Sequence, residues 1–241
     1  MEESDPGGSY REGKRLLEGD RREASGVNRT RKAQRVPRKA GYHHGNLRKT
    51  LIDVALRLVG EKGSAAVTLR EVARIAGVSH QAPYRHFADR AELLAAVAEE
   101  GFQSLHAYIL DRGRAASDPR AALRAIGIAY VEFAVEHPAH FRVMYGVEAA
   151  QSRRADATIG ASAASVFAAL TQTIAEAQRG QNVSSDTLDY ALAAWSMVHG
   201  LASLLVDGQL QPRLYGDKSP VELADIVART LRRGLGEAPT R

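Results

Sequence analysis

Apolar side chains downstream of Asn46 recur with the period of an amphipathic α-helix. They fall on one helical face and are Leu47, Leu51, Val54, Leu58 and Val59. The run stops between Gly60 and Gly63, and glycines at that place favour a helix end. A first helix is therefore predicted from about residue 47 to this glycine pair.

A short second helix is predicted before Gly77, a residue that suits the left-handed position at a helix C-terminus. Thr68 and Glu71 have the spacing of a capping box. In that motif the Thr68 hydroxyl accepts a hydrogen bond from the Glu71 amide, and the Glu71 carboxylate accepts one from the Thr68 amide. Val67 and Val72 are spaced for a hydrophobic staple. The residues predicted to face inward are Leu69, Val72, Ala73 and Ala76.

A third short helix is predicted to begin at Ser79 or His80, with Pro83 in or near its first turn. The next helix is expected to begin at Asp89, whose side chain can cap it with Glu92 three residues later. Three short helices thus lie close together in sequence, which is typical of a small helical module.

The remainder of the chain is also predicted to be helical, because no strand-like alternation bounded by turns occurs in it. Proline or cap residues mark the helix starts at Asp118-Pro119, His137-Pro138, Ser184 or Ser185, and Ser219-Pro220. The predicted fold class is therefore all-α, with a three-helix module followed by a larger helical domain.

The helix expected after Ser185 is apolar on two sides. One stripe consists of Leu188, Leu192, Trp195, His199, Ala202 and Val206. The second stripe consists of Ala191, Ala194, Val198, Leu201 and Leu205. Such a helix is either buried in a large core or shared between a core and a partner subunit. In a chain of 241 residues the second option is attractive.

The composition is that of a soluble globular protein, with 44% hydrophobic and 25% charged residues. The absence of cysteine excludes disulfide frameworks, thiol catalysis and Cys-ligated zinc, and it fits a reducing compartment such as the cytoplasm. No apolar run approaches the ~18 residues that a membrane span requires, and the amino terminus lacks the apolar core of a signal peptide. We therefore expect a cytoplasmic protein without a membrane partner.

The net charge of +5 is distributed unevenly. Residues 21–40 carry 8 basic and 1 acidic side chains, residues 41–90 carry 8 and 4, and residues 91–241 carry 14 and 17. Because Lys and Arg supply most of the sequence-independent affinity for nucleic acid, residues 21–90 are the candidate nucleic-acid face. Residues 1–40 are too polar to form a core and are predicted to be a flexible basic arm. A misassigned start or an inert tail explains that segment equally well.

Catalysis is not indicated by the pattern of reactive side chains. The eight histidines are the main candidates, and His137 and His140 could lie one helical turn apart. No Asp or Glu stands at metal-ligand spacing from them, and neither a phosphate-binding glycine loop nor a Gly-x-Ser-x-Gly motif is present. We expect no catalytic residues, no metal and no cofactor.

The segment around Gly77 has the features of a helix-turn-helix, in which the second helix enters the major groove of DNA. Ala73 is small enough for the two helices to approach, and Gly77 permits the turn between them. Val78, Pro83 and Phe87 are expected to point back into the core. The same pattern also occurs in helical bundles that bind no DNA, so this alternative stays open at the level of pattern.

The outward side chains of this segment suit contacts with DNA. Gln81 can bond an adenine edge and Ala82 can contact a thymine methyl group, and Arg70 can reach a guanine. Side chains better suited to phosphates are Tyr84, His86 and Arg90. The Thr68 hydroxyl at the positive end of the second helix adds another phosphate site.

Four stretches carry a resemblance to a known family. They are residues 41–47 (GYHHGNL), 69–73 (LREVA), 76–80 (AGVSH) and 83–87 (PYRHF). Together they resemble the amino-terminal module of the TetR family of transcriptional repressors, over about residues 43–106. The resemblance implies a DNA-binding module at 41–90 and a ligand-binding and dimerisation domain at 91–241. It further implies a homodimer that reads a palindromic DNA operator and is released by a small-molecule effector.

The resemblance also assigns roles to individual residues. It implies that Thr68, Tyr84, His86 and Arg90 hold the DNA backbone. It implies that Arg70, His80, Gln81 and Ala82 face the bases. Because base-facing positions vary within the family, the operator sequence does not follow from the resemblance.

The larger domain resembles TetR-type sensor domains that carry a Trp-x-x-x-His-Gly signature, here Trp195, His199 and Gly200. Small-molecule sites have large apolar walls with few polar groups. A pocket is therefore predicted where helices bearing Tyr130, Phe133, Met144, Tyr145, Phe167, Trp195 and His199 converge. Ordinary core packing of these side chains, or a dimerisation domain with no effector, remains open as an alternative.

Overall fold

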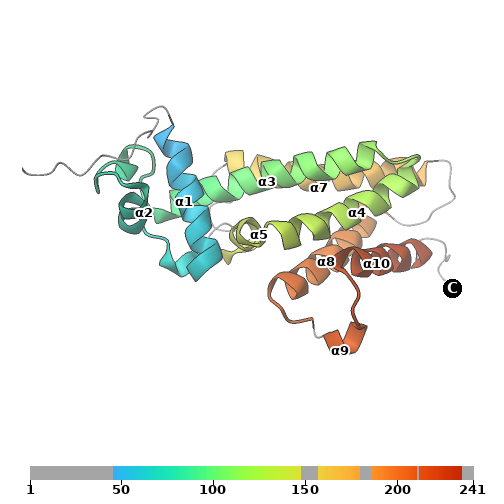
Figure 1. Cartoon of the computed structure of the whole chain (residues 1–241). Helices are drawn as coiled ribbons and strands as arrows, with labels where there is room; N and C mark the ends of the chain where they lie inside the picture. The colour runs from blue at the N-terminus through green and yellow to red at the C-terminus, as the bar shows by residue number, and fades with distance from the viewer. Residues whose placement is uncertain (1–45, 148–156, 180–185, 211, 235–241) are drawn as a thin grey trace, which may run out of the picture. The chain divides into compact units, whose positions relative to one another are not determined.

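The computed structural model describes residues 46–147, 157–179, 186–210 and 212–234 (Figure 1). Every regular element among the described residues is helical, which confirms the predicted all-α class. Residues 43–241 form one compact unit. The predicted basic arm at residues 1–40 lies outside the described residues, and the domain boundary near residue 90 stays a prediction.

The first helix, α1 (Leu47–Lys62), begins where the apolar period begins. The Asn46 side chain caps it by accepting a hydrogen bond from the Lys49 amide at 3.1 Å. The buried face comprises Leu51, Ile52, Val54, Ala55, Leu58 and Val59. A single 3-10 turn, η1 (Ser64–Ala66), connects α1 to the next helix.

The second helix, α2 (Leu69–Ala76), has the predicted bounds and the predicted buried face. The Thr68 hydroxyl accepts the Glu71 amide at 3.1 Å, as expected for the cap. The reciprocal half of the capping box was predicted wrongly, because both Glu71 carboxylate oxygens accept hydrogen bonds from Arg74 instead, at 2.8 and 2.7 Å. A guanidinium one turn away offers two charge-assisted bonds, which are stronger than one bond from a neutral amide.

The predicted third α-helix does not form. Residues 79–86, hereafter the reading segment, consist of successive turns that contain one 3-10 helix, η2 (Pro83–Arg85). The Ala82 amide donates to the Ser79 carbonyl at 3.0 Å and the His86 amide donates to the Pro83 carbonyl at 2.9 Å. Since Pro83 has no N–H, it cannot donate the bond that would continue an α-helix through this point.

The larger part of the described chain is a layered helical bundle. Its elements are α3 (Arg90–Arg114), α4 (Pro119–Glu136), α5 (Pro138–Tyr145), α7 (Ala157–Gln178), α8 (Thr187–Val206), α9 (Pro212–Tyr215) and α10 (Pro220–Gly234). Helix α4 is central, because it packs against α3, α5, α7, α8 and α10 (Figure 1). Helix α1 packs against both α3 and α5, which joins the first helices to the bundle.

The helix starts in the bundle follow the predicted cap signals. The Asp118 carboxylate accepts the amides of Arg120 and Ala121, both at 2.9 Å, at the start of α4. Ser219 and Glu222 form a capping box in which the Glu222 carboxylate accepts the Ser219 amide at 2.7 Å. Ser184 and Ser185 lie outside the described residues, and α8 is capped by Asp186.

Helix α8 differs from the expectation that no apolar run in the chain is long enough to span a membrane. Within the described residues it is the one helix long and apolar enough to cross a membrane by length and composition, although no run of that kind was expected. It packs against α4, α7 and α10, so it serves as a bundle helix here. Its buried residues are Tyr190, Ala191, Ala194, Val198 and Ala202, whereas its exposed large apolar residues are Leu188, Leu192 and Leu204.

A pair of glycine substitutions tests the turn after α2. Gly77 has φ 70°, which is left-handed, whereas Gly60 is an exposed position inside α1. We expect Gly77→Ala to lower the free energy of unfolding by about 1–2 kcal/mol because of backbone strain. Gly60→Ala should raise it by up to about 1 kcal/mol through helix propensity, since its Cβ would meet Ala139 at an ordinary 3.7 Å. Urea unfolding of both variants checks this, and equal effects would contradict the assigned turn.

Candidate functional site

The reading segment and the start of α2 form one exposed surface. A depression on it is lined by Arg70, His80, Gln81 and Tyr84. All four side chains are exposed, and Tyr84 is 48% exposed although it is aromatic. The fold thus brings together three of the predicted base-facing residues and one predicted phosphate-binding residue.

The other predicted residues of this surface lie around the depression. Ala82 and His86 are half-buried, and Thr68 is exposed at the N-terminus of α2. The Thr68 hydroxyl oxygen already accepts the Glu71 amide, and its proton can still be donated. The Arg48 guanidinium, which the sequence analysis did not single out, lies 5.4 Å from the ring centre of Phe87. The spacing along α1 gave no signal for that contact.

A buried layer holds the reading segment in place. Ala73 is fully buried, Phe87 is 1% exposed, and Pro83 is also buried. Val78 is half-buried against the same core, and its amide donates to the Ala73 carbonyl at 3.0 Å. Because the apolar side of the segment faces this core, its polar side chains are directed outward.

Arg90 has a different environment from the one expected. Its Nε donates to the Val67 carbonyl at 2.8 Å and its Nη2 donates to the Ser64 carbonyl at 2.7 Å. The side chain is half-buried and ties the start of α3 to the connection between α1 and α2. The guanidinium is therefore a brace within the protein, which competes with the phosphate contact predicted from sequence.

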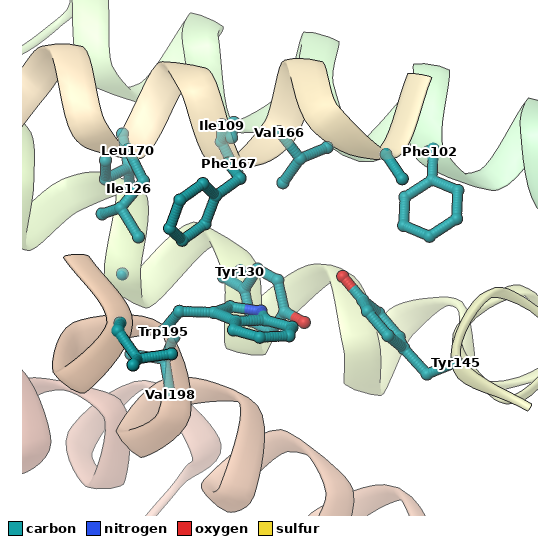
Figure 2. A pocket seen from close by; sticks show the side chains of 13 residues that line it. Phe102, Ile109, Ile126, Tyr130, Tyr145, Val166, Phe167, Leu170, Trp195 and Val198 are labelled. Atoms are coloured by element: carbon teal, nitrogen blue, oxygen red, sulfur yellow. The ribbon is translucent and has the colours of Figure 1, made fainter. Parts of the chain in front are cut away.

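A second site lies inside the bundle, where a cavity of about 350 Å³ opens between α3, α4, α7 and α8 (Figure 2). Of the residues predicted to form a pocket, it is lined by Tyr130, Tyr145, Phe167 and Trp195. The lining residues that sequence reasoning missed are Phe102, Ile109, Ile126, Gly127, Ala163, Val166, Leu170, Leu192 and Val198. Most come from α3 and α7, whose apolar residues carried no signature distinguishing a cavity wall from core.

Three predicted pocket residues do not line this cavity. Phe133 is 1% exposed and packs on the rings of Tyr108 and His137, with ring centres 6.0 and 4.7 Å away. Met144 is fully buried where α3 and α5 meet, and a Cβ on Gly101 would lie only 2.6 Å from its sulfur. Both are core residues in this fold.

His199, the third, is not a lining residue but contacts two residues that line the cavity. Its Nδ1 lies 2.9 Å from the Tyr130 hydroxyl oxygen, and its ring centre is 4.5 Å from that of Tyr145. Burial lowers the pKa of His199, and burial together with the nearby Tyr145 hydroxyl raises the pKa of Tyr130 well above its usual value. Both groups are therefore neutral at physiological pH.

No cluster of three or more His, Cys, Asp or Glu side chains suited to a metal ion occurs within the described ranges. The rings of His137 and His140 have centres 6.2 Å apart. Desolvation lowers the pKa of His140. His140 is half-buried and Glu100 and Asp53 also act on its pKa, whereas His137 is exposed at the start of α5.

Two family models match the chain. Residues 51–97 match the model described as bacterial regulatory proteins of the tetR family, and residues 123–231 match the tetracyclin repressor-like C-terminal domain. The HTH-type transcriptional regulator BetI of Rhizobium meliloti (strain 1021) is 37% identical over 79 residues, which are 33% of this chain. That alignment spans only 39% of BetI.

Solved structures resemble the chain over more of its length. A Rhodococcus sp. RHA1 protein of unknown function is 33% identical with a TM-score of 0.70, covering 81% of this chain and 98% of that protein. The TetR family transcriptional regulator PfmR of Thermus thermophilus is 22% identical with a TM-score of 0.61, covering 78% and 99%. At that identity PfmR supports the fold alone.

Replacing Arg90 tests its role as a brace. We expect Arg90→Ala to lower the free energy of unfolding by about 1–2 kcal/mol, because two backbone carbonyls lose charged hydrogen-bond donors. The exposed Arg70 serves as the matched control, and Arg70→Ala should change stability by less than about 0.5 kcal/mol. Chemical denaturation measures both. Equal stabilities of the two variants would contradict the assignment.

Proposed function

The chain belongs to the TetR family of bacterial regulatory proteins, and from that premise we propose that it is a ligand-responsive, sequence-specific DNA-binding repressor. The observation that carries the proposal is the exposed group of Arg70, His80, Gln81 and Tyr84 above a fully packed apolar layer. A repressor of this kind acts in the cytoplasm, where the DNA is, and needs no catalytic residues.

The reading segment supplies the chemistry for base recognition. Gln81 offers a donor and an acceptor that match an adenine edge, and Arg70 matches the two acceptors of guanine. His80 can donate to either purine, and the Ala82 methyl group suits a thymine methyl. Because the segment is held by buried Pro83 beneath it, these groups can enter the major groove without repacking.

Phosphate contacts would position the segment on the duplex. Tyr84 and His86 flank the reading side chains, and the Thr68 hydroxyl lies at the positive end of α2. The bonds from Arg90 to Val67 and Ser64 favour an indirect role for that residue, in which it holds α3 and the α1–α2 connection in a fixed relation.

Reading a palindromic operator requires two copies of the module, and an apolar surface on α8 and α10 supports dimerisation. Its exposed large side chains include Leu188, Leu204, Val221 and Ile226. Helices α8 and α10 pack side by side, so both helices can contribute to one interface. Covering that surface with a second copy of the chain would remove it from water. In the DNA-bound dimer the two reading segments should lie roughly 34–36 Å apart.

The cavity supports a sensor function for the bundle. Trp195 lines it and His199 bonds to the lining residue Tyr130, so two residues of the Trp-x-x-x-His-Gly signature meet at this site. Phe102 and Ile109 bring α3 into the same wall. A ligand that fits better when α3 is shifted would lower DNA affinity, by no more than its difference in affinity for the two arrangements.

Substitutions in the reading segment test base recognition. Gln81→Ala should relax preference at a single base pair, worth about 1–3 kcal/mol, since a bidentate contact is lost. Tyr84→Phe should weaken all sequences to a similar degree, because a phosphate contact carries no sequence information. Selection of bound DNA from a random library, followed by competition binding, measures both. An unchanged base preference in Gln81→Ala would contradict the assignment of Gln81.

A charged residue on α8 tests the dimer surface. Leu188 is 60% exposed in the single chain, and Leu188→Glu should shift the protein from dimer to monomer. The matched control is Val147→Glu, which places the same charge at a 76% exposed apolar position two residues beyond α5. Sedimentation velocity separates the two species. A dimer that survives in Leu188→Glu with unchanged affinity would place the interface elsewhere.

A further inference from the structure

The polar groups of the cavity lie together, and the rest of its wall is hydrocarbon. Figure 2 shows the hydroxyl oxygens of Tyr130 and Tyr145 directed into the same part of the cavity, with the Trp195 indole beside them. The Tyr130 hydroxyl is bonded to His199 at 2.9 Å. Farther along, the wall is formed by aliphatic side chains such as Ile126 and Leu170. The cavity is thus amphipathic, with a small polar region and a larger apolar region.

None of the lining residues that the structure describes carries a formal charge. The pKa shifts of the polar side chains agree with this uncharged wall. Burial alone lowers the pKa of His199. The pKa of Tyr130 is affected by burial and, besides it, only by Tyr145 and Trp195. No described Asp, Glu, Lys or Arg contributes to either shift. A charged ligand would therefore enter this cavity without a counter-charge from the described wall.

Resting on the proposed sensor function, we propose that the effector is an uncharged, largely apolar molecule of one or two rings that carries one hydroxyl or carbonyl oxygen. The oxygen bonds within the polar group of Tyr130, Tyr145 and Trp195, and the hydrocarbon body lies along Ile126 and Leu170. The cavity of about 350 Å³ is at the small end of the range for ligand pockets, which limits the effector to this size.

The free-energy cost of burying a charge favours a neutral ligand over an anion or a cation. Burying an ion without a partner costs several kcal/mol even after the protein relaxes. A carboxylate finds only neutral donors here. A cation would gain only a weak attraction from the aromatic faces of the wall, which does not offset its desolvation. A neutral alcohol or ketone loses little solvation and keeps a hydrogen bond.

Leu192 marks the way into the cavity. It is 56% exposed, whereas the other described lining residues are buried or half-buried. The cavity therefore meets the surface next to this α8 side chain. A ligand that enters there passes apolar surface first, which again favours an uncharged molecule.

Three probes that differ only in one substituent test the proposal in the full-length protein. They are 4-tert-butylcyclohexanol, the corresponding carboxylate and the corresponding trimethylammonium ion. Trp195 is the only tryptophan of the chain, so its fluorescence reports binding at the cavity wall. We expect the alcohol to bind at least about a hundredfold more tightly than either ion, since several kcal/mol correspond to that ratio.

Two pairs of variants locate the binding. Ala163→Phe fills the cavity from α7 and should abolish alcohol binding, whereas Ala164→Phe at the neighbouring exposed position should not. Tyr130→Phe should weaken the alcohol about three- to tenfold through loss of one hydrogen bond. Tyr215→Phe, which alters an exposed tyrosine on α9, should have no effect. Because Tyr130→Phe keeps the ring, it tests the proposal even if Ala163→Phe does not fold.

Either ion binding as tightly as the alcohol, no response to any of the three probes, or alcohol binding unaffected by Tyr130→Phe would overturn the proposal. A mobility-shift assay of the same protein with selected DNA separates this failure from that of the proposed function. Retained DNA binding with tight binding of an ion overturns only the ligand class. Absence of DNA binding in the unliganded protein overturns the repressor function, whatever the probes do.

Discussion

The brace that Arg90 forms at the start of α3 is the constraint that relates the two candidate sites to each other. Its guanidinium bonds the carbonyls of Ser64 and Val67, which fixes the connection between α1 and α2 to the first turn of a 25-residue helix. The same helix carries Phe102 and Ile109 into the wall of the cavity. Helix α3 is therefore bonded to the connection that leads into α2 and also lines the candidate sensor site, so a displacement of α3 would affect both.

The reading segment depends on packing rather than on its own hydrogen bonds. A single 3-10 turn at Pro83–Arg85 has few internal bonds, and an isolated turn of this length would not persist in water. The buried side chains of Phe87 and Pro83 anchor the segment in the core. Gly77, with its left-handed backbone, sets the direction in which the chain leaves α2. The outward direction of Gln81 and Tyr84 follows from these three constraints.

Helix α8 contributes both to the cavity wall and to the surface proposed for dimerisation. On one side Trp195 and Val198 line the cavity, and on another Leu188 and Leu204 lie exposed on the surface proposed for dimerisation. Because one rigid helix presents both faces, filling the cavity and associating two chains act on the same element. A small change in the tilt of α8 would alter the separation of two reading segments in a dimer.

Local sequence alone accounts for most of the helices and most of their starts, with the exception of the α-helix predicted at the reading segment. Periodicity, caps such as Asp118 and the glycine at 77 are local features whose physics needs no distant partner. The folded arrangement, in contrast, establishes what residues far apart in the chain do together. Arg90 became a brace because the carbonyls of Ser64 and Val67 lie within its reach. Phe133 is part of the core, whereas Val166 lines the cavity. Apolar periodicity predicts which face of a helix is buried, but it does not show whether that face packs against another side chain or borders a cavity.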